Sequence, residues 1–234
     1  MINVSISYGF GPDNKYKMKK IPVAIQLALY KYELWEEYSD DIVNEIYQNN
    51  VKVNAVHLPL DTMRQPVHKI LEMMKILSST ILCEKFIFHP NKGAEFFIQS
   101  FLSSGMNAIL CIENFPHRKK KALRNPLYII ERCMQDNTQR LKLCLDTSHT
   151  EETWFHPHIM PYILKYTSVI HLSNRKGKSQ HLPFNMQNAD LNLVGFVKEL
   201  KKRFQWKGDI VLEYMPEYHH KLYRNHDYLT RLIT

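Results

Sequence analysis

Six short apolar runs in this sequence end in a histidine or a carboxylate, the side chains that bind divalent metals in proteins. The runs are Val53-Asn54-Ala55-Val56-His57, Phe86-Ile87-Phe88-His89, Ile109-Leu110-Cys111-Ile112-Glu113, Leu143-Cys144-Leu145-Asp146, Ser168-Val169-Ile170-His171 and Ile210-Val211-Leu212-Glu213. Two more histidines follow closely, His149 after Asp146 and His181 in the loop after His171. Imidazole nitrogen combined with carboxylate oxygen is a ligand field that suits zinc, manganese or iron. All eight polar residues are therefore candidate metal ligands.

A set of this size predicts more than one metal. A carboxylate such as Glu113 can bridge two ions, and the step from Asp146 to His149 can send two ligands to neighbouring ions. Two ions about 4 Å apart can activate a water and stabilise the leaving oxygen of a phosphate ester. We expect two to three ions per chain, zinc first, with manganese or iron as alternatives. A single histidine at a strand end is more often a structural residue, but eight buried polar groups need compensation, which metals supply.

The segments between these runs predict the fold. Short apolar runs of this kind are typical of buried strands, and helix-length segments separate them. Strands alternating with helices predict a parallel sheet, and eight strands predict closure into a barrel, whose active site lies at the carboxyl ends of the strands. We expect a single α/β domain over residues 1–234, a (β/α)8 TIM barrel whose first crossover helix is short or missing. The expected strands are 2–7, 22–28, 52–57, 84–89, 108–113, 141–146, 167–172 and 209–213, and the expected helices are 33–48, 66–80, 92–104, 124–135, 158–165, 190–204 and 219–233.

The charge balance indicates an anionic ligand. The 234-residue chain has a formal net charge of +8 and a pI near 9.2. Arg118 and Lys119 follow Glu113, and Arg175 follows His171, so these cations are candidates for substrate binding at the rim of the polar cluster. The predicted partner is an anionic small molecule or a nucleic acid. A general basic bias of the source proteome would give the same net charge.

Several classes of protein are not favoured. The sequence contains no run of about 18 apolar residues, which a transmembrane helix would need. The N-terminal residues have no signal-peptide pattern, and no membrane partner is expected. The four cysteines show no CxxC spacing, which favours a reducing, cytoplasmic setting. No glycine-rich phosphate loop and no serine-nucleophile motif is present. The oligomeric state cannot be derived from these features.

Seven strings of the sequence together resemble one superfamily. They are His57-Leu58-Pro59-Leu60, Phe88-His89-Pro90, Ile112-Glu113-Asn114, Leu143-Cys144-Leu145-Asp146-Thr147-Ser148-His149, Ile170-His171-Leu172-Ser173, His181-Leu182-Pro183-Phe184 and Val211-Leu212-Glu213-Tyr214. The chain from about Val23 onward resembles the xylose-isomerase-like TIM barrels, which include AP endonuclease family 2 with endonuclease IV, and sugar isomerases and epimerases. The ordered set is specific for the superfamily but not for one reaction.

The resemblance to endonuclease IV implies a trinuclear site and phosphate ester hydrolysis on a phosphorylated or nucleic-acid substrate, with Glu113 and Glu213 as catalytic residues. It implies a first metal on His57, His89 and Glu113, a second on Glu113, Asp146, His171 and Glu213, and a third on His149 and His181. Two positions depart from that pattern. Ser179 stands where the third metal has an aspartate, and Leu60 stands where the enzyme has a tyrosine used on DNA.

Two alternatives remain open. The sugar isomerase or epimerase branch implies one metal on Glu113, Asp146, His171 and Glu213, with the two glutamates moving a proton at a sugar carbon. That branch has a glutamate where this chain has Lys119 and an arginine where it has Gly177. A non-catalytic metal-binding barrel is the second alternative, which Ser179 would allow. Hydrolysis is the leading expectation at this stage.

Overall fold

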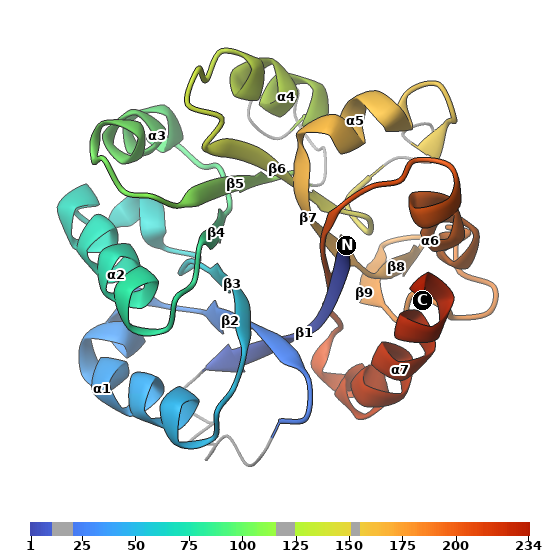
Figure 1. The fold of residues 1–234 in the computed structure, drawn as a ribbon, viewed down its shortest axis with the longest axis horizontal. Coiled ribbons are helices and arrows are strands. Elements are labelled where there is room, and N and C mark those ends of the chain that lie inside the picture. Colours follow the sequence, from blue (N-terminus) through green and yellow to red (C-terminus); the bar gives the residue numbers. More distant parts are fainter. Residues whose placement is uncertain (11–20, 116–124, 151–154) are drawn as a thin grey trace.

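A closed barrel of eight parallel strands forms the centre of the protein (Figure 1). The computed structural model describes residues 1–10, 21–115, 125–150 and 155–234. Around the barrel the strands follow the order β1-β10-β7-β6-β5-β4-β3-β2. Their bounds are β1 (Ile2–Phe10), β2 (Ala24–Leu29), β3 (Val53–His57), β4 (Lys85–Phe88), β5 (Ile109–Glu113), β6 (Leu141–Asp146), β7 (Thr167–Leu172) and β10 (Gly208–Leu212). The TIM barrel predicted from the alternating pattern is confirmed.

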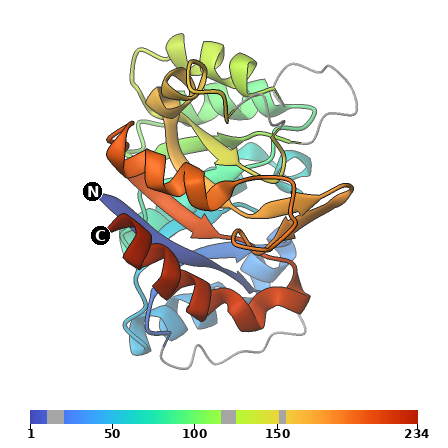
Figure 2. The ribbon, with the colours of Figure 1, turned by 90° about the vertical axis from the view of Figure 1, so that its right-hand side faces the viewer.

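Within the described residues, seven α-helices lie outside the strands and cover the barrel wall (Figures 1 and 2). They are α1 (Tyr32–Gln48), α2 (Val67–Thr80), α3 (Ala94–Ser103), α4 (Pro126–Met134), α5 (Met160–Tyr166), α6 (Leu193–Lys202) and α7 (Leu222–Ile233). Each buries one apolar stripe against the sheet, as Phe97, Ile98 and Phe101 do on α3. None of the helices in the described ranges is long and apolar enough to cross a membrane.

The connections differ from the expected pattern in two places. The segment after His171, expected as a loop, contains an antiparallel hairpin of β8 (Asn174–Lys176) and β9 (Ser179–Leu182). The helix expected over 219–233 begins instead as a 3-10 helix, η4 (Pro216–Lys221), before α7. Most of the first crossover, residues 11–20, lies outside the described residues, and residues 21–23 contain no helix.

The strands alternate between a face that packs on the helices and a face that fills the barrel. Six buried residues, one from each of six neighbouring strands, form a small apolar cluster separate from the main core: Ala55, Ile87, Cys111, Cys144, Val169 and Val211. Because strand side chains alternate with a period of two, the residue two positions later on each strand points to the same side. Those later residues are His57, His89, Glu113, Asp146, His171 and Glu213. A polar layer at the carboxyl end thus lies directly above the apolar layer.

The opposite end of the barrel interior is closed by a polar contact. The Lys85 ammonium of β4 lies 2.7 Å from a carboxylate oxygen of Asp209 on β10. The other oxygen of Asp209 accepts a hydrogen bond from the Asn3 amide at 2.8 Å. The interior therefore has three layers, which is how TIM barrels fill their centre.

Candidate metal centre

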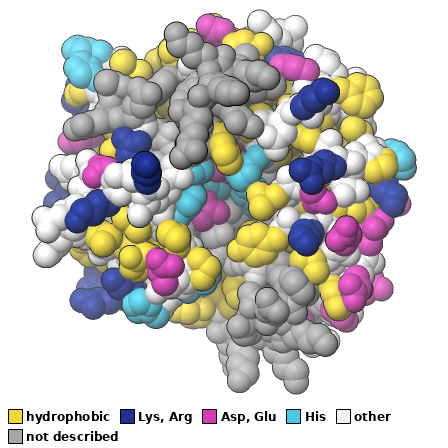
Figure 3. All heavy atoms as spheres, turned by 180° about the vertical axis from the view of Figure 1, so that it is seen from behind, with side chains coloured by type: hydrophobic (Ala, Val, Ile, Leu, Met, Phe, Trp, Pro, Cys, Tyr) yellow, Lys and Arg dark blue, Asp and Glu magenta, His cyan; other side chains and the backbone are white. Residues whose placement is uncertain are grey.

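The carboxylate of Glu113 lies at the middle of the polar layer. Its Oε2 atom is 3.1 Å from His57 Nε2, 3.2 Å from His89 Nε2 and 3.5 Å from His171 Nδ1. His57, Glu113 and His171 are buried, and His89 is half-buried. Figure 3 looks onto this end of the barrel, where histidine and acidic side chains line a hollow at the centre.

A second group forms around Asp146. Its Oδ1 atom accepts hydrogen bonds from the backbone N–H and hydroxyl of Ser148, at 2.7 and 2.9 Å. Its Oδ2 atom is buried, has no hydrogen-bond partner, and lies 3.3 Å from His149 Nδ1 and 3.8 Å from His181 Nδ1. The same nitrogen of His149 is 3.2 Å from the carbonyl of Asn114, which competes for it.

A third group joins the first two. One donor atom from each of Glu113, Asp146, His171 and Glu213 lies within 4.8 Å of the others. His171 Nδ1 is 2.9 Å from Glu213 Oε2, an ion-pair contact, yet this buried nitrogen has no hydrogen-bond partner. The other ring nitrogen of His171 is 2.8 Å from the Gln26 side-chain oxygen and donates to it. His171 Nδ1 and Glu213 Oε2 are therefore close enough to share a cation but are not aligned for a hydrogen bond with each other.

These observations fit a divalent metal. Donor atoms bound about 2.1 Å from an ion lie roughly 3 to 4 Å from one another, which is the range seen among these side chains. His57 and His171 each hydrogen-bond through one ring nitrogen to a holding partner, the Leu58 carbonyl and Gln26, and turn the other nitrogen toward Glu113, with which His57 also forms a hydrogen bond of 3.1 Å. Asp146 uses Oδ1 to accept hydrogen bonds from Ser148 and leaves Oδ2 without a hydrogen-bond partner. Metal ligands are characteristically held in this way by a second set of partners.

Histidines in the polar layer stabilise the ionised form of the two glutamates. Burial raises the pKa of the Glu113 carboxyl, but His89 and His171 outweigh that effect and hold the pKa well below its usual value. Burial also opposes ionisation of Glu213, and His171 and His181 nevertheless lower its pKa to about 2. Both carboxylates are thus ionised at neutral pH. An incoming cation would replace protons on the histidines as the compensating charge.

Two polar side chains that the sequence did not single out fix the ligands in place. The Asn114 amide donates to the Asp146 carbonyl at 3.0 Å, and its oxygen accepts from the Asp146 N–H at 2.7 Å, which ties the end of β5 to the end of β6. Gln26 reaches His171 from β2. The position of Asn114 directly after Glu113 was the available signal. Gln26 could have been noticed as a polar residue inside an apolar strand.

The structure brings all eight predicted ligands together, namely His57, His89, Glu113, Asp146, His149, His171, His181 and Glu213. The predicted cations are placed differently. Arg175 lies on β8, with its Nε atom 3.9 Å from Asp190, and does not line the cavity over the ligands. Arg118 and Lys119 lie outside the described residues. Ser179 is exposed at the start of β9, and Gly177 forms the hairpin turn with a φ of +57°.

A cavity of about 240 Å³ opens above the ligands. Ligand side chains form its floor, and apolar and aromatic residues form its walls. The wall residues are Ala28, Leu29, Tyr30, Leu60 and Phe115, with Gln180 on the hairpin side. This volume is below the range of drug-sized ligand sites, so the described part of the site suits a small substrate.

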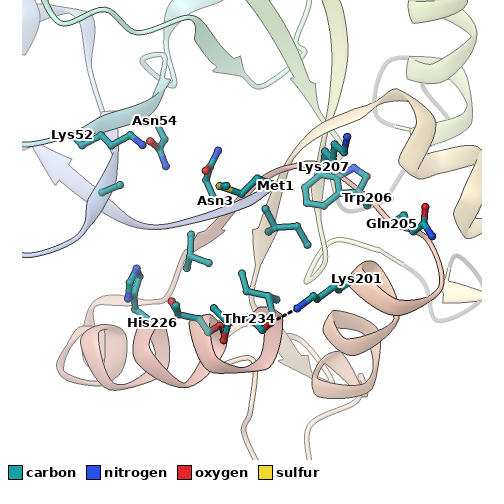
Figure 4. Close-up of a pocket in the computed structure, with 15 residues that line it drawn as sticks. Met1, Asn3, Lys52, Asn54, Lys201, Gln205, Trp206, Lys207, His226 and Thr234 are labelled. Carbon is teal, nitrogen blue, oxygen red and sulfur yellow. Dashed lines mark hydrogen bonds between the residues drawn. The ribbon is translucent and has the colours of Figure 1, made fainter.

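A larger cavity, of about 710 Å³, lies at the other end of the barrel (Figure 4). Asn3, Lys52, Trp206 and His226 are among the residues that line it, and its described lining contains no aspartate or glutamate side chain. This end carries the amino termini of the strands, where TIM barrels place residues for stability and not for catalysis. Size alone therefore does not identify the functional site.

Solved structures with the same fold were found by comparison. No protein-family model matches the sequence, and no curated protein matches it. A D-tagatose 3-epimerase-like protein has 12% identity over 98% of this chain and 96% of its own, with a TM-score of 0.68. D-psicose 3-epimerase from Clostridium cellulolyticum, solved with D-tagatose, has 14% identity over 99% and 95%, with a TM-score of 0.64. A xylose isomerase-like TIM barrel protein from Mycobacterium smegmatis, in complex with magnesium, has 9% identity over 85% and 78%, with a TM-score of 0.61. The chain therefore has the xylose isomerase-like TIM barrel fold that its motifs predict.

Proposed function

We propose that this protein is a divalent-metal-dependent epimerase or isomerase of a small carbohydrate. The observation that carries the proposal is the group of Glu113, Asp146, His171 and Glu213, whose two glutamates line a small cavity while Asp146 and His171 are buried beneath it. Solved neighbours of the same fold are named as epimerases, which supports the same reaction class. The expectation of phosphate ester hydrolysis finds no support in those names.

The placement of the two glutamates suits proton transfer on both sides of one carbon. Glu113 is the last residue of β5, and Glu213 comes directly after β10. In the barrel, β6 and β7 lie between these two strands. A substrate lying between them presents one face to each carboxylate. One ionised glutamate can remove the proton from the carbon next to a carbonyl and later pass it to water, while the other glutamate takes a proton from water and delivers it to the opposite face. The carbon then has the inverted configuration, and no atom is lost from the substrate.

A divalent ion on these four residues would supply polarisation of the substrate carbonyl. The protein's own contribution is to keep both glutamates ionised and to hold His171 through Gln26. The aromatic and apolar wall of Tyr30, Leu60 and Phe115 limits the water that reaches the reacting carbon. Zinc, manganese and magnesium all accept ligands of this kind, with zinc favoured by the histidine-rich set.

The experiment is a deuterium-exchange assay on the metal-loaded protein with ketopentoses and ketohexoses in D₂O, followed by NMR. We expect an epimeric product with deuterium at the inverted carbon. Glu213→Gln should abolish both product and exchange, because the amide cannot accept the proton. Hydrolysis of a phosphodiester with no exchange into any sugar would refute the proposal.

A multinuclear phosphoesterase is the second candidate, and a specific observation favours it. His57 and His89 form a donor group with Glu113, and His149 and His181 form another with Asp146, beyond the four residues that one ion needs. Extra groups of this kind would hold further ions able to activate water and stabilise a leaving oxygen. Counting bound ions per chain is the measurement that separates the two candidates.

A further inference from the structure

A second cavity adjoins the cavity over the metal centre. It has a volume of about 570 Å³ and lies over the loops that follow β2, β3 and β4. Tyr30 and Leu60 line both cavities, so the two share a wall and open toward the same end of the barrel. Figure 3 shows Lys and Arg side chains on either side of the central hollow at this end.

Three cations line this second cavity. Lys31 follows β2, Arg64 belongs to the 3-10 helix η1 (Thr62–Arg64) after β3, and Lys92 follows β4. All three are exposed, and none forms an ion pair with a residue in the described ranges. Three separate loops thus bring unpaired positive charge to one place beside the metal centre.

The one carboxylate of the cavity is already engaged. Asp61 accepts a hydrogen bond from the Tyr32 backbone N–H at 3.1 Å on one oxygen and from the Gln65 amide at 2.8 Å on the other. Asp61 therefore fixes the loop and does not neutralise the lysines or the arginine by direct contact. Tyr32 also begins the 17-residue helix α1, whose positive end adds to the field at Lys31.

We propose that the substrate carries a phosphate group, which Lys31, Arg64 and Lys92 bind while the carbon skeleton lies over the metal centre. This inference rests on the proposed function and narrows its substrate class to a phosphorylated sugar. A phosphate monoester carries nearly two negative charges at neutral pH, matching three cations offset by one carboxylate. Arginine and lysine are the side chains that bind phosphate most strongly. Tyr30 and Leu60, which line both cavities, are themselves about half exposed, so a small molecule can extend over them with one end in each cavity.

The test compares binding of phosphorylated and unphosphorylated partners to the metal-loaded protein by calorimetry. The probes are D-ribulose 5-phosphate with D-ribulose, and D-fructose 6-phosphate with D-fructose. We expect at least one phosphorylated probe to bind about tenfold tighter or more than its partner, the gain of one or two charged hydrogen bonds. The double variant Arg64→Gln with Lys92→Gln should lose that preference. The control, Lys75→Gln with Lys198→Gln, makes the same charge change at exposed helix positions outside both cavities and should keep the preference.

The outcomes separate this inference from the proposed function. Equal affinity for both partners of each pair, with deuterium exchange into unphosphorylated sugars, would overturn the phosphate site and leave the epimerase intact. A phosphate preference that depends on Arg64 and Lys92, without exchange into any sugar, would support the phosphate site and refute the epimerase. Tighter binding of a duplex with an abasic site, lost in the same double variant, would overturn the sugar phosphate in favour of nucleic acid.

Discussion

At the scale of single residues, Asp146 and His171 each have one atom held by a hydrogen bond and one buried atom without a hydrogen-bond partner. His171 is the clearest case, because Gln26 occupies one ring nitrogen while the other has no hydrogen-bond partner. An imidazole held in this way cannot rotate away from the site, and its tautomer is fixed. The affinity for metal should therefore depend on residues that never touch the ion.

Gln26→Leu tests that dependence. The substitution removes the acceptor for His171 Nε2 and should weaken metal binding about 10- to 100-fold. Competition with a chromophoric chelator measures the affinity. Gln26→Glu keeps an acceptor at the same position and serves as the matched control. Unchanged metal affinity in Gln26→Leu would mean that packing alone holds the imidazole.

His57→Ala separates the ligands that one ion needs from the additional ones. On the proposed function, this variant keeps the ion held by Glu113, Asp146, His171 and Glu213, and it retains more turnover than Glu213→Gln does. Elemental analysis of the ions per chain, alongside the deuterium-exchange rate, is the measurement. If His57→Ala loses one ion and all turnover together, the multinuclear hydrolase becomes the better explanation.

At the scale of elements, hydrogen bonds between strand ends hold the ligands in register. Asn114 joins β5 to β6 through two bonds to the backbone of Asp146. Thr147 links the next pair, since its hydroxyl lies 2.6 Å from the carbonyl of Ser173 just after β7. The ends of three neighbouring strands are thus tied at the level of the metal centre, so the ligand spacing does not depend on the loops.

Asn114→Ala removes the first of these links. It leaves the buried N–H of Asp146 without an acceptor, which should lower the free energy of unfolding by about 1 to 3 kcal/mol. Urea denaturation of the metal-free protein gives the value without a contribution from bound ions. Asn107→Ala, at an exposed position, should change it by less than about 0.5 kcal/mol. An equal effect in both variants would contradict a role for the link.

The sequence predicted these strands because the alternation of side chains with a period of two can be recognised within a few neighbouring residues. In Cys111-Ile112-Glu113 the interior residue, the helix-facing residue and the ligand are three neighbours, and the motif repeats on six strands. The hairpin of β8 and β9 was missed because its strands are three and four residues long and mostly polar. Arg64 and Lys92 were missed because nothing in a loop sequence shows which cavity its side chains line.

At the scale of the whole molecule, charged contacts close both ends of the barrel interior. At the amino end, Lys85 and Asp209 join β4 to β10 across the barrel, and Asp209 is buried. Removing one member of a buried pair leaves an uncompensated charge. Lys85→Met should therefore destabilise the protein by about 3 to 5 kcal/mol, measured by urea denaturation. Combining Lys85→Met with Asp209→Asn should recover part of that loss. If Lys85→Met alone leaves the free energy of unfolding unchanged, water must compensate the charge of Asp209.

At the carboxyl end, the metal itself should act as a clamp, because its four proposed ligands come from four neighbouring strands, β5, β6, β7 and β10. An ion at 100 times its dissociation constant adds about 2.7 kcal/mol to the free energy of unfolding. For a chain of this length, that corresponds to a rise in melting temperature of roughly 5 to 10 °C. Thermal scans with zinc or manganese, and with excess chelator, measure it. Glu113→Gln should abolish the rise, since Glu113 belongs to three of the donor groups, whereas the Lys85→Met variant should melt lower but keep the full shift. A metal-induced rise that survives Glu113→Gln would place the stabilising ion elsewhere in the molecule.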